Sequence, residues 1–92
     1  MDVYYPPGSG LAAPEMLNSL SGLEFMQRLA AGTIPPPPIA ITLGFGIASV
    51  ERGKVTVTSR VGAHTYNPMG TIHGGYAATL LDTCMGCAVM TG

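Results

Sequence analysis

The chain has 92 residues, of which 47% are apolar and 10% charged, and its formal net charge at pH 7 is -1. This balance is typical of a globular domain and excludes a disordered chain. The four basic residues are scattered (Arg28, Arg52, Lys54, Arg60), so no basic face exists for nucleic acid or for an anionic membrane. We therefore expect the partner to be a small molecule or a second copy of the chain.

The first residues, to about position 13, are rich in Pro, Gly and Ala and have no hydrophobic period. We expect a flexible tail that extends to residue 20. Asp2 and the prolines at positions 6 and 7 interrupt any apolar run, so the stretch does not resemble a signal peptide. We predict a cytoplasmic protein.

A first helix is predicted to begin at Ser21. Ser21 and Glu24 have the spacing of a capping box, in which the serine oxygen accepts an amide and the glutamate reaches back to the serine amide. Apolar residues then recur at helical spacing, and Gly32 supplies the stop. The domain proper is therefore predicted to span residues 21–92.

Pro35–Pro38 cannot donate backbone hydrogen bonds, so we interpret this run as a stiff extended spacer. A short apolar turn over 39–43 then leads into a first strand over 44–51. Arg52 and Gly53 make the turn to a second strand over 54–61. The alternation of valines with threonines in the second strand indicates one buried and one solvated face.

The segment from Gly74 to Thr91 is apolar nearly all round, which predicts a helix enclosed on most sides. A membrane span is the competing interpretation, but Asp82 and the opening glycine pair act against it. Cys84 and Cys87 lie about three turns inside this helix. We interpret them as two small buried hydrophobes, with redox chemistry or metal binding as the alternative.

Two strands cannot enclose a helix that is apolar on every side, because such a helix needs a wider sheet around it. We therefore expect these 92 residues to be the front part of a longer domain, truncated after the central helix.

The start of the predicted central helix offers groups suited to acyl transfer. Its first amides lack intrahelical acceptors, and Gly74 and Gly75 have no side chains to block an approaching carbonyl oxygen. Asp82 lies eight residues along, which is about 12 Å of rise and about 80° of rotation. One carbonyl cannot touch both groups on the same helix, so Asp82 must come from a second, antiparallel copy in a two-fold dimer. Asn67, on the incoming loop, could orient the attacking water or the thioester.

Simpler interpretations remain for each of these residues. The glycine pair could be a tight turn, Asn67 a turn former, and Asp82 a cap for a partner backbone. His73 is most simply a structural residue that fixes the loop by a ring hydrogen bond. Two histidines with a remote carboxylate make a metal site improbable, so none is predicted.

The stretch NPMGTIHGGYAATLLD resembles the hotdog-fold thioesterases of the phenylacetic-acid-degradation (PaaI-like) family, whose pattern is N-x-x-G-x-x-H-G-G followed by a helix with Asp or Glu. The resemblance covers roughly residues 21–92 and places six residues in register (Asn67, Gly70, His73, Gly74, Gly75, Asp82). It implies an α+β fold in which an antiparallel sheet wraps a long central helix, and dimers that pair into tetramers.

The resemblance also implies hydrolysis of acyl-CoA thioesters, such as phenylacetyl-CoA or another aryl or medium-chain acyl-CoA, without a cofactor. Gly74 would donate its amide to the thioester carbonyl, and Asp82 of the opposite subunit would be the nucleophile or general base. Asn67 would hold water or substrate, with His73 and Gly75 as substrate contacts. The alternatives are a non-catalytic module that binds acyl-CoA or an aromatic ligand, and an inactive fragment.

Overall fold

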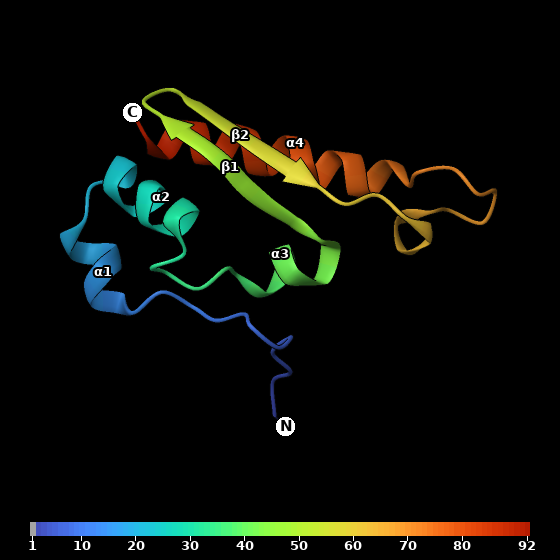
Figure 1. Cartoon of the computed structure of the whole chain (residues 1–92), viewed down its shortest axis with the longest axis horizontal. Helices are drawn as coiled ribbons and strands as arrows, with labels where there is room; N and C mark the ends of the chain where they lie inside the picture. The colour runs from blue at the N-terminus through green and yellow to red at the C-terminus, as the bar shows by residue number, and fades with distance from the viewer. Residues whose placement is uncertain (1) are drawn as a thin grey trace.

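The computed structural model describes residues 2–92 and has an α+β architecture. The elements in chain order are listed by their bounds: α1 (Pro14–Ser19), α2 (Gly22–Ala31), α3 (Pro38–Leu43), β1 (Phe45–Glu51), β2 (Lys54–Ser59), the 3-10 turn η1 (Ala63–Thr65) and α4 (Gly74–Met90). The two strands form an antiparallel hairpin that lies along α4, while α2 packs against β1 (Figure 1). The α+β class predicted from sequence is therefore confirmed.

The predicted capping box forms at the start of α2. The Ser21 hydroxyl accepts the Glu24 amide at 3.1 Å, and the Glu24 carboxylate accepts the Ser21 amide at 3.2 Å. Hydrogen bonding of the Glu24 carboxyl with the side chain and the backbone amide of Ser21 lowers its pKa, because these contacts stabilise the charged form. Gly32 ends the helix in the left-handed conformation, with φ of 83°. Both ends of α2 thus follow the prediction.

The hairpin also follows the prediction, with shorter strands. Glu51 pairs with Lys54 across the two-residue turn, and a bulge interrupts the register between Ile47 and Ser49. Along β2, Val55 and Val57 are half-buried while their neighbours are exposed. The valines face α4, which packs against this strand.

Two short helices were not predicted. α1 occupies part of the predicted tail, and α3 replaces the predicted apolar turn after the proline run. Each begins at a proline, Pro14 or Pro38, in the first helical turn. Proline is well suited there, because the amide that it lacks would have no intrahelical acceptor.

The C-terminal end of α4 is tied to the turn of the hairpin. The Thr91 hydroxyl accepts the Gly53 amide at 2.6 Å and donates to the Ala88 carbonyl at 2.7 Å, and the Thr91 residue is fully buried. Gly22, at the start of α2, lies so close to the Met90 carbonyl that no side chain fits between them. Both contacts hold the C-terminal end of α4. The N-terminal end of the helix lies at the opposite side of the molecule, next to the loop that leads into it (Figure 1).

The prediction that α4 is enclosed on most sides is wrong for this chain. Tyr76 is its one buried residue, whereas Leu81, Met85 and Val89 are exposed, at 62%, 62% and 81%. The physical reason is that two strands cover one side of a helix only. Asp82 is likewise exposed to solvent rather than sunk among apolar side chains.

Candidate functional site

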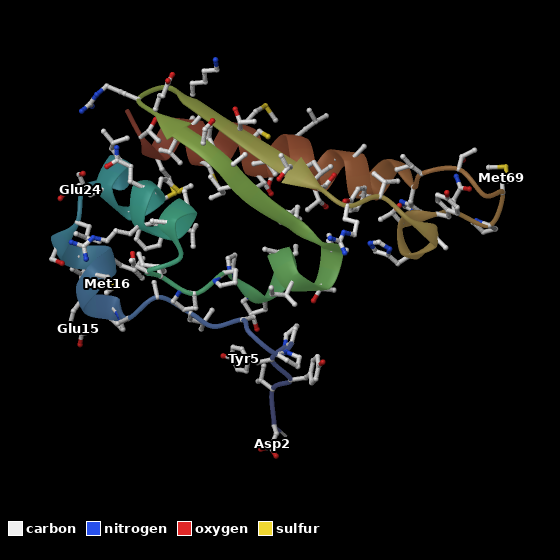
Figure 2. The ribbon with its side chains drawn as sticks, in the orientation of Figure 1. Asp2, Tyr5, Glu15, Met16, Glu24 and Met69 are labelled. Carbon is white, nitrogen blue, oxygen red and sulfur yellow. The ribbon has the colours of Figure 1, made fainter. Side chains whose placement is uncertain are left out.

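The candidate site lies at the N-terminal end of α4, where the chain arrives through a tight loop. Asn67 organises this loop: its carboxamide oxygen accepts the Met69 amide at 3.0 Å and the Thr71 amide at 3.2 Å, and its amide nitrogen donates to the Thr71 hydroxyl at 2.8 Å. Gly70 takes a positive φ of 82° inside the same turn. Met69 stands at the tip, at the opposite end of the molecule from Glu24 (Figure 2). The turn-forming interpretation of Asn67 is thus what the contacts support.

The loop is joined to η1 just before the helix begins. The His73 amide donates to the Thr65 carbonyl at 2.7 Å, and Tyr66 forms an isolated bridge with Ile72. The Thr65 hydroxyl in turn donates to the Gly62 carbonyl, and Thr65 is buried. These contacts fix the direction in which α4 starts.

His73 caps α4. Its ring nitrogen Nδ1 accepts the Gly75 amide at 2.8 Å, so that nitrogen carries no proton in this arrangement. A side chain at position 75 would collide with the ring, since an added Cβ would lie 2.9 Å from Nδ1. The structural interpretation of His73 is therefore supported, and Gly75 is required for the cap. In this conformation the Gly75 amide is engaged rather than free.

Gly74 is different from Gly75. Among residues 2–92, no acceptor is found for its amide, and an added Cβ would meet nothing within 4 Å. An exposed amide at the positive end of a 17-residue helix is a donor suited to a carbonyl oxygen that gains negative charge. Gly74 thus offers an unpaired backbone donor at the start of α4.

A cavity of about 330 Å³ lies beside this helix start. Its walls come from α3, η1 with the residue that follows it, and the first turns of α4: Leu43, His64, Thr65, Tyr66, His73, Gly75, Tyr76 and Thr79. Sequence reasoning did not place His64, Tyr66 or Tyr76 at this site. No spacing pattern could have done so, because the pairing of the loop with η1 is what brings them together.

Asp82 does not lie in this cavity. Thr79 is the last residue of α4 that lines the cavity. Asp82 is not part of the wall, and its side chain is exposed to solvent. At about 1.5 Å of rise per residue, the backbone of Asp82 is about 12 Å from that of Gly74. Of the site residues predicted from sequence, the structure therefore brings His73 and Gly75 together in the wall of this cavity, whereas Asn67, Gly74 and Asp82 do not line it.

The two cysteines show no sign of reactive chemistry. Both thiols are free and half-buried. Burial, followed by the charges of Cys84 and Asp82, raises the pKa of the Cys87 thiol, so this thiol stays protonated near neutral pH. Such a group is a poor nucleophile, which favours the packing interpretation over a redox one.

Across residues 2–92, no group of three or more His, Cys, Asp or Glu side chains has the arrangement of a metal site. No helix in that range combines the length and apolarity needed to cross a membrane. Comparison of the chain with protein-family models, curated protein sequences and solved structures finds no match in any of the three.

Proposed function

We propose that the chain is part of a hotdog-fold acyl-CoA thioesterase whose active site forms between two subunits. The observation that carries the proposal is the Gly74 amide, which has no acceptor in residues 2–92 and belongs to an exposed residue at the start of a long helix. An amide in this position can bind a thioester carbonyl and stabilise the negative charge that develops on its oxygen during attack. The resemblance around the glycine pair supports the same role.

Asp82 of a second subunit supplies the base in this proposal. Its carboxylate takes a proton from water, the resulting hydroxide bonds to the thioester carbon, and the carbonyl electrons move onto the oxygen held by Gly74. When the carbonyl re-forms, the carbon–sulfur bond breaks and the proton passes to the leaving CoA thiolate. Direct attack by the carboxylate, followed by hydrolysis of an anhydride, uses the same two groups.

The exposed face of α4 supports an assembly of two chains. Leu81, Met85 and Val89 are spaced by four residues and therefore lie along one side of the helix, where they are exposed. A continuous apolar stripe of this kind is typical of an association surface. Asp82 projects beside the stripe, so a partner helix that covers the stripe also approaches the carboxylate. The proposed assembly is a homodimer, or a tetramer of two dimers, of a cytoplasmic enzyme, and the proposed reaction uses no metal or cofactor.

A module that binds acyl-CoA or an aromatic ligand without turnover is the second candidate. The observation that favours it is Asn67, whose carboxamide is committed to its own loop and so has little capacity left to hold water. Tight binding of phenylacetyl-CoA with no release of free thiol would support this candidate.

The test is hydrolysis of phenylacetyl-CoA and octanoyl-CoA, followed with a thiol-reactive dye. Asp82→Asn should lower kcat by about 10²- to 10⁴-fold, because it removes the proton acceptor while keeping nearly the same shape. Circular dichroism should be unchanged, because the side chain is exposed. Activity of the variant equal to that of the wild type would remove Asp82 from the mechanism. Absence of thiol release by the wild type would contradict the enzymatic proposal itself.

Gly74 allows a matched pair of variants. Gly74→Pro deletes the amide hydrogen at the first helical position, where proline is tolerated, and the extended backbone of His73 suits a following proline. Gly74→Ala keeps the amide, and its Cβ meets open space. We expect kcat to fall by about 10²- to 10³-fold in the proline variant but much less in the alanine variant. Equal loss in both variants would point to a steric effect and contradict the role of the amide.

A further inference from the structure

A second cavity, separate from the one at the start of α4, lies between α2, the proline segment, β1 and the C-terminal half of α4. Its volume is about 320 Å³. The walls are mostly apolar and include Leu29 of α2, Pro36 and Pro37, Phe45 and Ile47 of β1, and Cys87 of α4. These segments are neighbours in the fold, because α2 packs against β1 and also contacts α4.

The walls of this cavity offer almost nothing to a polar ligand. None of the residues that line it is charged. The one hydroxyl, of Thr83, donates to the Thr79 carbonyl at 2.8 Å, and the Gly32 amide donates to the Leu29 carbonyl at 3.3 Å. The remaining polar side chain is the Cys87 thiol, a weak hydrogen-bond donor. The enclosed part of an occupant should therefore be uncharged and mainly apolar, because a charged group would find no charged side chain to pair with there.

The size of the cavity limits the occupant further. A volume of 320 Å³ is at the lower end of the range of small-molecule sites, which is about 300–1,000 Å³. It is enough for an alkyl chain of medium length or for an aromatic ring with its linker, but not for a whole coenzyme. Thr83, in the wall, directly follows Asp82 on α4, so the cavity and the carboxylate lie at the same level of the helix, on faces about 100° apart.

We propose that this cavity binds the alkyl or aryl group of an acyl thioester, with Cys87 in direct contact with that group. The proposal rests on the proposed function for the identity of the ligand, and it deepens that function by assigning the acyl group a place apart from the helix start. The thiol takes no covalent part. Because Cys87 lies in the wall, it can serve as a built-in reporter of occupancy.

The test uses S-octyl-CoA, a thioether that cannot be hydrolysed, and CoA alone as the control ligand. In a Cys84→Ala background, the rate of alkylation of Cys87 by iodoacetamide is measured by mass spectrometry with and without each ligand. We expect saturating S-octyl-CoA to slow alkylation at least tenfold and CoA to have no effect. Equal alkylation rates with and without S-octyl-CoA would overturn the proposal.

A filling variant provides the second measurement. Cys87→Phe places a ring in the cavity, whereas Leu17→Phe places the same ring on the exposed surface of α1, away from both cavities. By calorimetry, we expect Cys87→Phe to weaken binding of S-octyl-CoA at least tenfold and Leu17→Phe to leave it within twofold. Equal affinities in the two variants, or no saturable binding to the wild type, would contradict the proposal. Protection of Cys87 in a protein that hydrolyses no thioester would contradict the proposed function and leave this inference standing.

Discussion

The polar side chains at and before the start of α4 form hydrogen bonds within their own short segments. The Asn67 carboxamide holds its own turn, and the His73 ring holds the Gly75 amide. The Gly74 amide stands apart, because it is not needed by the cap or by the loop. At the scale of single residues, Asn67 and His73 therefore hold the loop and the helix start in place, while the Gly74 amide is left without an acceptor and can bind a ligand.

Tyr76 is the buried residue whose hydrogen bonding is incomplete. Its side chain is 6% exposed, and among residues 2–92 its hydroxyl has no partner. An unpaired buried hydroxyl costs free energy of folding, because it loses its bonds to water. Tyr76→Phe should therefore leave the free energy of unfolding unchanged or raise it by up to about 1 kcal/mol. Urea unfolding measures this, and a loss larger than about 1 kcal/mol would mean that the hydroxyl is bonded in solution.

At the scale of the elements, the ends of helices were predictable where the signal comes from residues within one turn of each other. The capping box at Ser21, the glycine stop at Gly32 and the start of the long helix at Gly74 were all predicted from neighbouring residues and are confirmed. The helix α1 was missed because residues up to 20 were predicted to be a flexible tail, and α3 because Pro38 was assigned to a stiff spacer, although proline favours the first turn of a helix. The tertiary contacts of a segment decide between these roles. In α3, Ala40 is buried against the rest of the fold, a contact that the sequence does not reveal.

Two glycines in helices should respond in opposite ways to the same substitution. Gly86 lies in the exposed middle of α4, and an added Cβ there meets nothing within 4 Å. Gly86→Ala should raise the free energy of unfolding by about 0.5–1 kcal/mol, because alanine loses less backbone entropy in a helix. Gly22→Ala should instead lower it, since the Cβ would collide with the Met90 carbonyl and separate α2 from α4.

Urea unfolding of both variants beside the wild type provides the measurement. A loss of more than about 1 kcal/mol is expected for Gly22→Ala, because the obstacle is backbone rather than a flexible side chain. Stabilisation by both substitutions would show that α2 does not dock on the end of α4.

At the scale of the whole molecule, the buried apolar core is small. Within the described residues it consists of Met26, Ile34, Ala40 and Tyr76, while much of α4 remains exposed. The sequence pattern predicted the long apolar helix but not its exposure, because apolar composition does not reveal which element covers each face. For the same reason the position of Asp82 on the helix was predictable from spacing, whereas its burial was not. The carboxylate can act in a water-poor site only if further protein covers it.

The most direct test of the shared-site proposal is complementation between two inactive chains. Gly74→Pro removes the amide and Asp82→Asn removes the base, and in a mixed dimer one site combines the intact Gly74 of one chain with the intact Asp82 of the other. Random pairing of equal amounts should restore about one quarter of the wild-type sites. The measurement is thiol release from phenylacetyl-CoA after the two variants are unfolded together and refolded. We predict activity close to that fraction; a mixture as inactive as its separate components would contradict an active site shared between subunits.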